Sequence, residues 1–191
     1  MALLREFHEA MGKLIFAYEG TLERFTGDGL MVFFNDPEPI PQPVEHAVRM
    51  ALAMREQAAQ LGEHWRKLGY DLGLAIGVAQ GFATMGAIGF EARLDYAAIG
   101  SVTNLAARLG AEANAGEILV NGKTLAPVES LVRVESLGVL ELKGFRRRFL
   151  RTASLAWRQH DARSSSAKER RQSLNRHPGP RDSSGDLSVS D

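Results

Sequence analysis

The chain has 191 residues, enough for one domain and a tail, and its 45% of hydrophobic residues can form a core. The 23 basic and 23 acidic residues balance to a formal net charge of zero, which argues against a general nucleic-acid-binding or membrane-surface protein. Without cysteine, disulfides and cysteine-bound zinc are excluded. We expect a cytoplasmic protein without a membrane segment, because no apolar run approaches the roughly 20 residues that span a bilayer.

The first predicted element is an amphipathic helix near the N-terminus. Apolar residues from Leu4 to Tyr18 recur at alternating steps of three and four, which is the spacing of one helix face. Gly20 is predicted to end this helix, because glycine readily adopts the left-handed conformation that follows many last turns. Since the chain starts at once inside the helix, we expect that a preceding segment is missing.

Residues 20–34, GTLERFTGDGLMVFF, follow as two apolar-rich runs on either side of residues 26–29. An Asp-Gly pair between such runs is a strong hairpin signal, because both residues tolerate the positive φ that tight turns require. The hairpin places the carboxylate of Asp28 at an exposed tip, where the flanking glycines let a phosphate-bound metal come close. The spacing alone is compatible with a purely structural turn and with a metal ligand at Asp28.

Residues 35–43 contain four of the seven prolines and are predicted to form a loop. From Val44 to Leu68 the apolar residues again keep the spacing of three and four, which predicts a long helix with one core-facing stripe. His46 and His64 lie off this stripe, so we interpret them as solvated surface residues rather than as metal ligands.

Residues 69–89 are rich in small and β-branched residues and are punctuated by glycine. This composition predicts strands with close backbone approach and a tight turn near Gln80-Gly81. The glycine spacing does not match the G-x-G-x-x-G fingerprint of dinucleotide-binding sites. Further along, Gly122-Lys123-Thr124 lacks the earlier glycine of a phosphate-binding P-loop and is predicted to be a turn that opens a short helix.

Residues 95–109, DYAAIGSVTNLAARL, are predicted to form a strand that ends at Gly100 and then a helix. The apolar residues of this helix form a buried stripe. Asn104 and Arg108 stand one turn apart and project together from another face. An isolated pair of this kind is often an ordinary polar face, so the pattern by itself leaves its role open.

The last part of the predicted domain is a strand over residues 116–120 and an antiparallel pair, 131–141 and 149–155, around Lys143-Gly144. From residue 158 onward the chain is polar and rich in Ser and Arg, so it cannot bury enough surface to offset its ordering entropy. We therefore predict a domain over residues 1–157 and a disordered tail over residues 158–191.

The order of the elements mixes helices and strands without regular alternation, which predicts an α+β fold. Four segments, in the same order, resemble the catalytic domain of the class III nucleotide cyclases, the adenylyl and guanylyl cyclases. These segments are GTLERFTGDGLMVFF, LGLAIGVAQGFATMGAIG, DYAAIGSVTNLAARL and LELKGF. The resemblance covers residues 1–155 and implies a ferredoxin-like α/β sandwich of the cyclase type that lacks its first strand.

The resemblance implies an enzyme that converts ATP, or less readily GTP, into a 3′,5′-cyclic nucleotide and pyrophosphate in intracellular signalling. In this family the residue at the position of Asp28 binds the catalytic metals, and the residue at the position of Asn104 orients the ribose. The residue at the position of Arg108 stabilises the α-phosphate in the transition state, and the one at Lys143 holds the terminal phosphates.

Arg24 and Ala97 correspond in this resemblance to the substrate-binding residues that select the base. The family commonly has Lys at the first position, and adenylyl cyclases commonly have Asp or Thr at the second. An alanine cannot hydrogen-bond a purine edge, so the expected preference for ATP over GTP comes from the family rather than from these two residues.

The family reaction uses two Mg²⁺ or Mn²⁺ ions, held by the equivalent of Asp28 and by a second Asp on a strand before the first helix. Such an Asp, in a motif of the type F-x-D-I-x-G-F, is absent from this chain, which implies an impaired enzyme unless another segment supplies it. Two domains pair head to tail in the family, which implies a homodimer with its sites at the interface. The alternative is a non-catalytic, cyclase-like dimerisation or regulatory module.

Overall fold

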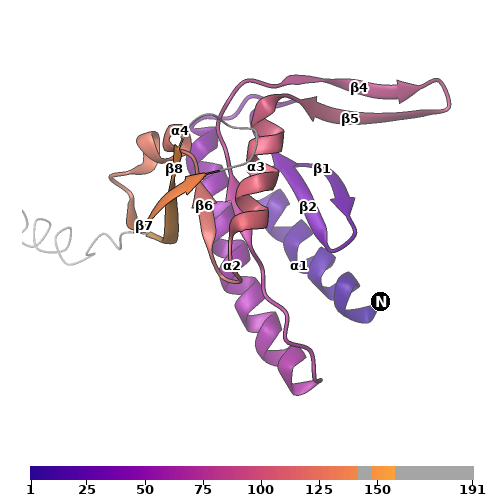
Figure 1. Ribbon diagram of the computed structural model, residues 1–191. Coiled ribbons are helices and arrows are strands. Elements are labelled where there is room, and N and C mark those ends of the chain that lie inside the picture. The colour runs from indigo at the N-terminus through magenta and orange to yellow at the C-terminus, as the bar shows by residue number, and fades with distance from the viewer. Residues whose placement is uncertain (142–147, 158–191) are drawn as a thin grey trace, which may run out of the picture. The chain divides into compact units, whose positions relative to one another are not determined.

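The computed structural model describes residues 1–141 and 148–157, all within the first of the two units into which the chain divides (Figure 1). Lys143 and the predicted tail, residues 158–191, lie outside the described residues. Helices and strands are mixed along the chain, which confirms the predicted α+β class. Within the described residues, none of the helices combines the length and the apolar character needed to cross a membrane.

Helix α1, Ala2–Ala17, confirms the first predicted helix. It ends with a hydrogen bond of 2.9 Å from the Gly20 N–H to the Ile15 carbonyl. The left-handed residue at this end is Glu19, with φ 59°, so the conformational role predicted for Gly20 is wrong. Gly20 is required by packing instead, because a Cβ there would lie 2.9 Å from Val32 Cγ1.

Strands β1, Thr21–Thr26, and β2, Gly29–Phe33, form the predicted antiparallel hairpin, with Thr26 paired with Gly29 beside the turn. The hairpin lies against α1, and its inner residues pack on a cluster that α1 shares with the second long helix. The buried members of this cluster are Phe7, Met11, Ile15, Met50, Met54 and Trp65. The local hydrophobic pattern therefore placed both elements correctly.

Helix α2, Pro43–Lys67, is the predicted long helix and contributes to two core clusters. On the side of α1, Trp65 Nε1 donates a hydrogen bond of 2.8 Å to Glu6 Oε2. On its other side α2 packs on residues from the second half of the domain. That cluster contains Val48, Ala51, Ile118, Val120, Val128 and Val132.

His46 is not the solvated residue that the helical pattern predicted. It is half-buried near the start of α2, and its Nδ1 lies 3.1 Å from the Tyr18 carbonyl oxygen and 3.2 Å from Glu19 Oε2. The end of α1 covers this face of α2, a contact between distant segments that helical spacing cannot reveal. His64 is exposed, as predicted.

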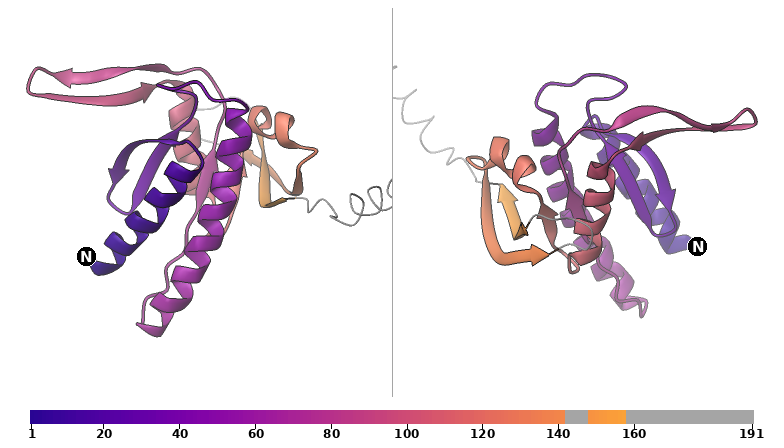
Figure 2. Two further views of the ribbon diagram at one scale, coloured as in Figure 1. Left: turned by 180° about the vertical axis from the view of Figure 1, so that it is seen from behind. Right: turned by 45° about the horizontal axis from the view of Figure 1, so that its top comes forward.

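Strands β3, Ile76–Val78, and β6, Ile118–Val120, pair in parallel, whereas β4, Thr84–Phe90, and β5, Arg93–Ile99, form a separate antiparallel hairpin. The tight turn predicted near Gln80-Gly81 is therefore wrong, because β3 and β4 do not pair with each other. Both views of Figure 2 show the β4–β5 hairpin reaching away from the helices.

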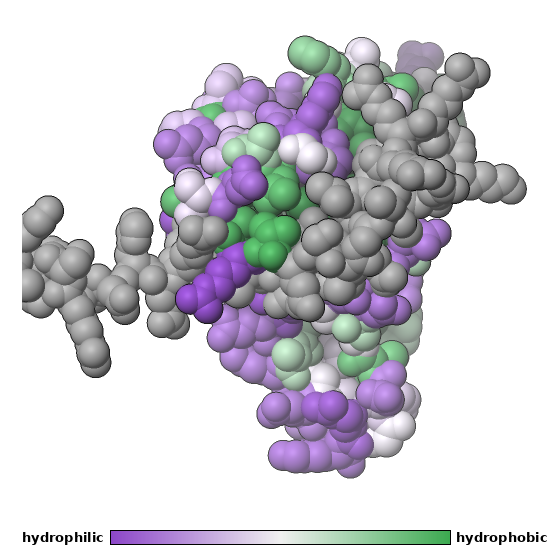
Figure 3. Space-filling view, turned by 60° about the vertical axis from the view of Figure 1, so that its left-hand side comes forward, coloured by the Kyte–Doolittle hydropathy of each residue, from purple (hydrophilic) through white to green (hydrophobic). Residues whose placement is uncertain are grey.

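Helix α3, Ser101–Glu112, follows β5 as predicted and contacts β3 and β6. Helix α4, Gly122–Leu125, and the short 3-10 helix η1, Ala126–Val128, come after β6. Strands β7, Val132–Glu141, and β8, Arg148–Trp157, form the predicted closing pair, and β8 contacts β6. Figure 3 shows one face of the molecule, where hydrophilic residues predominate and a smaller group of hydrophobic residues is exposed among them.

Candidate functional site

Asp28 lies in the turn between β1 and β2 and is exposed. Gly27 before it has φ 66°, a conformation that side-chain-bearing residues rarely adopt, and Gly29 follows it. The turn chemistry therefore fixes the carboxylate at the tip of the hairpin, where sequence reasoning expected it. A carboxylate exposed in this way is a ligand type that hard divalent cations prefer.

Asn104 and Arg108 lie one turn apart on α3, and both are exposed. The neighbouring Leu105 and Leu109 are buried, with 8% and 0% of their surfaces exposed, in a cluster with Leu119 of β6. Burial of this apolar stripe fixes the rotation of α3 about its axis. The polar pair is thus presented on the outer face of a helix anchored to the core, as the spacing predicted.

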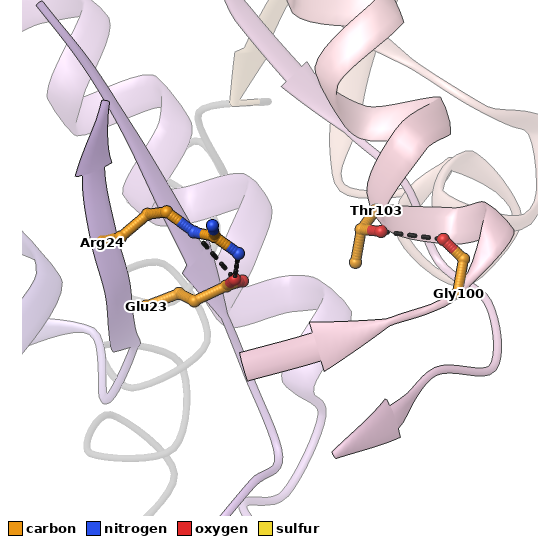
Figure 4. A network of polar contacts seen from close by, with 4 residues as sticks. All are labelled: Glu23, Arg24, Gly100 and Thr103. Atoms are coloured by element: carbon orange, nitrogen blue, oxygen red, sulfur yellow. Dashed lines mark hydrogen bonds and ion pairs between the residues drawn. The ribbon is translucent and has the colours of Figure 1, made fainter. Parts of the chain in front are cut away.

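The position of α3 is set by glycine contacts beneath it. A Cβ at Gly77 of β3 would lie 2.2 Å from the Ala106 carbonyl oxygen and 2.3 Å from the Gly110 nitrogen. Only a residue without a side chain permits this approach of strand and helix. At the start of α3, Thr103 Oγ1 donates a hydrogen bond of 2.7 Å to the Gly100 carbonyl (Figure 4).

Arg24 lies on β1 and forms an ion pair with Glu23 (Figure 4). The Arg24 Nε donates a hydrogen bond of 3.0 Å to Glu23 Oε1, and its Nη2 contacts the same oxygen. The pKa of Arg24 is raised by this hydrogen bond and by the negative charge of Glu23, with a smaller contribution from Asp95. The sequence indicated Arg24 as a base-selecting residue but did not indicate its ion pair with Glu23.

Ala97 lies on β5 and is 5% exposed. Asp95 precedes it by two residues, so the two share one face of the strand. Strands β1 and β5 contact each other, and the charge of Asp95 reaches Arg24. The structure therefore brings together the strands that carry Arg24 and Ala97, the two positions predicted to face the base.

Asp36, in the proline-rich loop, is a second polar residue that sequence reasoning missed. Its carboxylate accepts a hydrogen bond from the Tyr96 hydroxyl, which raises the pKa of Tyr96, and its carbonyl accepts one of 2.8 Å from Thr21 Oγ1. The loop is thereby tied to β1 and to β5. No local pattern could have shown this, because Asp36 and Tyr96 are 60 residues apart.

The described part of the chain contains no group of three or more His, Cys, Asp or Glu side chains that could hold a metal ion. Asp28, at the exposed tip of the hairpin, therefore belongs to no such group. Lys143, the remaining predicted site residue, lies outside the described residues. The described candidates thus fall at three places: the tip of the β1–β2 hairpin, the contacting strands β1 and β5, and the outer face of α3.

Residues 1–155 match a family model described as the adenylate and guanylate cyclase catalytic domain. Among curated proteins, Adenylate cyclase 1 of Rhizobium meliloti is 31% identical over 147 residues, which cover 75% of this chain. Adenylate cyclase of Anabaena cylindrica is 27% identical over 111 residues, which cover 56% of this chain. The matches span only 22% and 21% of the lengths of these two relatives.

Two solved structures show the same fold. The adenylyl cyclase CyaB from P. aeruginosa has a TM-score of 0.75 and 33% identity, with 81% of each chain covered. The guanylyl cyclase Cya2 has a TM-score of 0.75 and 24% identity, with 84% of this chain and 82% of that chain covered. Because the identity to Cya2 is only 24%, the similarity to that structure shows the fold alone.

Proposed function

Because the chain belongs to the family of adenylate and guanylate cyclase catalytic domains, we propose that it converts ATP, and GTP less readily, into a 3′,5′-cyclic nucleotide and pyrophosphate. The observation that carries this proposal is the anchored polar pair on α3, Asn104 and Arg108. The preference for ATP is supported by two relatives of 31% and 33% identity, which are named adenylate cyclase and adenylyl cyclase.

In the proposed reaction the ribose 3′-oxygen bonds to the α-phosphorus, the bond from that phosphorus to the pyrophosphate oxygen breaks, and the hydroxyl proton is lost. Negative charge spreads over the phosphate oxygens in the transition state. The guanidinium of Arg108 would bind those oxygens, since its fork of N–H groups matches phosphate geometry. Asn104, one turn away, would hold the ribose so that the 3′-oxygen is aligned for attack.

The proposed cofactor is Mg²⁺ or Mn²⁺, which when bound neutralises phosphate charge and lowers the pKa of the attacking hydroxyl. Asp28 is the described residue that would hold it, because its carboxylate is exposed between two glycines. Around it the described residues form no group of three or more His, Cys, Asp or Glu side chains that could hold the ion. Asp28 would contribute its carboxylate to the metal site.

The remaining proposed roles concern the ends of the substrate. Arg24, on the strand next to Ala97, would contact the base, and Lys143 would bind the terminal phosphates. Lys143 follows β7 in the chain, and its proposed role rests on the family pattern. Together these residues would bind a nucleoside triphosphate along its whole length.

The active form is proposed to be a homodimer. Support comes from the β4–β5 hairpin, which exposes several large apolar side chains, a feature that marks interaction surfaces when the side chains are contiguous. They are Ile88, Phe90, Leu94, Tyr96 and Ile99, which are 39% to 68% exposed. A second copy of the chain would cover this surface and would bring its own set of candidate residues to the interface.

The proposal is tested by incubating the purified chain with ATP or GTP in Mg²⁺ or Mn²⁺ and measuring cyclic nucleotide and pyrophosphate. We expect cyclic AMP from ATP, a lower yield from GTP, and a loss of about 100-fold or more in kcat for Arg108→Ala, as for other preorganised charge-stabilising donors. Arg66→Ala, at an exposed position of α2, is the matched control and should keep the wild-type rate.

Full activity in the Arg108→Ala variant would remove Arg108 from the mechanism. If the wild-type chain bound ATP but formed no cyclic nucleotide under any of these conditions, the proposed activity would be wrong for this chain. A non-catalytic module with the cyclase fold would then describe it better.

A further inference from the structure

Glu23 is the extra residue of a β-bulge. In the β1–β2 register Leu22 pairs with Val32 and Arg24 pairs with Met31, so Glu23 has no partner of its own. Neighbouring side chains of a regular strand point to opposite faces, whereas a bulge redirects one of them. Figure 4 shows the result: the Glu23 and Arg24 side chains leave β1 on the same side and meet.

The two members of this pair differ in burial. The Glu23 side chain is 4% exposed, whereas the Arg24 side chain is 58% exposed. A carboxylate removed from water in this way requires a cationic or hydrogen-bonding partner, and the guanidinium of Arg24 provides both. Because Nε and Nη2 of Arg24 are directed to Glu23 Oε1, the remaining N–H groups of the guanidinium are oriented by a buried anchor.

The anchored guanidinium lies beside the strand that carries Ala97. Strands β1 and β5 contact each other, and Asp95, on the same face of β5 as Ala97, acts electrostatically on Arg24. Ala97 is buried and its methyl group can form no hydrogen bond. Of these two side chains, only that of Arg24 can therefore form a polar contact with a base.

We propose that Glu23 is a positioning residue that fixes the guanidinium of Arg24 against the purine base, so that base selectivity depends on the Glu23–Arg24 pair and not on residue 97. This inference rests on the proposed function, since it concerns the nucleotide of the same site. Adenine presents an unprotonated N1 to a donor at its Watson–Crick edge, whereas guanine presents an N1–H. A guanidinium held in one orientation discriminates between these edges, and a mobile one adapts to both.

The test is a double-mutant cycle with Glu23→Gln, Arg24→Ala and the double variant. For each protein, the Kd values of non-hydrolysable ATP and GTP analogues and, where product forms, the kcat/KM values for ATP and GTP are measured. We expect Glu23→Gln to reduce the preference for ATP by about fivefold or more, and to have no further effect on selectivity when Arg24 is already Ala. Glu23→Asp, which keeps the charge, should retain part of the preference.

Glu45→Gln is the matched control, because it removes another Glu–Arg pair, with Arg49, that lies on α2 and not on β1 or β5. It should leave the ATP to GTP ratio unchanged. The inference is overturned if Glu23→Gln lowers only the melting temperature while the ratio stays at its wild-type value, or if its effect persists in the Arg24→Ala background.

The analogue Kd values separate this inference from the proposed function. A wild-type chain that forms no cyclic nucleotide, but whose binding preference is lost in Glu23→Gln, would contradict the proposed activity and support the role of Glu23. A wild-type chain that binds neither analogue would overturn the role of Glu23 as well.

Discussion

A single buried side chain, Asn121, joins three segments of the domain. Its Oδ1 accepts hydrogen bonds from the Gln80 N–H at 3.2 Å, the Thr124 N–H at 3.0 Å and the Thr124 hydroxyl at 2.6 Å. Its Nδ2 donates to the Gln80 carbonyl at 3.2 Å. Asn121 thus caps α4 and holds the segment that leads from β3 into β4.

Asn121→Ala should destabilise the domain by about 2–4 kcal/mol, because an N-cap is lost and the backbone N–H and carbonyl of Gln80 lose their part-buried hydrogen bonds. Denaturant unfolding measures the change as a shift of the midpoint at constant slope. Asn114→Ala, at an exposed position, is the control and should change the free energy of unfolding by less than about 0.5 kcal/mol. Equal effects of the two substitutions would show that the Asn121 network does not stabilise the fold.

The residues that sequence reasoning placed correctly are those whose position is set locally. Asp28 is fixed by its own Gly-Asp-Gly turn, and Asn104 and Arg108 by the apolar stripe of their own helix. The residues that it missed depend on distant partners or on register. Asn121 bonds a residue 41 positions away, and Glu23 meets Arg24 only because of the bulge, which the strand pattern does not reveal.

At the level of elements, the helices, the β1–β2 hairpin and the closing pair β7–β8 followed from periodicity and turn residues. The pairing of β3 with β6 and the β4–β5 hairpin did not. Glycines near residue 80 predicted a tight turn, whereas two of them serve close packing under α3. Gly77 lies against the backbone of α3, and a Cβ at Gly81 would lie 3.0 Å from the Val102 side chain. A glycine in a sequence does not distinguish a turn from a close approach, and the parallel partner β6 lies far along the chain.

Gly77→Ala should therefore displace α3, the helix that carries Asn104 and Arg108. We expect a loss of about 1–3 kcal/mol in stability, which is typical of overpacking. Nucleotide binding and any cyclase activity should fall by more than this loss of stability explains, because the polar pair is misplaced. Gly86→Ala on β4 is the matched control, since no atom lies within 4 Å of a Cβ built there. The free energy of unfolding and the nucleotide affinity are measured for both variants. If Gly77→Ala bound nucleotide as tightly as the wild type, the predicted displacement of α3 would be contradicted.

For the whole molecule, the distribution of the candidate residues bears on whether one chain or two chains form a site. Asp28 lies on the β1–β2 hairpin and the polar pair lies on α3, and the exposed apolar side chains of β4–β5 favour a second copy. In a two-fold dimer with shared sites, each site would take Asp28 from one protomer and Asn104 and Arg108 from the other. The dimer would then have two equivalent sites, each of which needs both chains.

This arrangement predicts complementation between inactive variants. Asp28→Ala and Arg108→Ala should each be inactive alone, because every site in either homodimer lacks one residue. When they are mixed in equal amounts and exchange freely, half of the dimers contain one intact site, so about a quarter of the wild-type activity should return. Cyclic nucleotide formation measures the recovery, and sedimentation confirms that mixed dimers have formed. If mixed dimers form without recovery, Asp28 and Arg108 act within one chain, and the interface does not assemble the site.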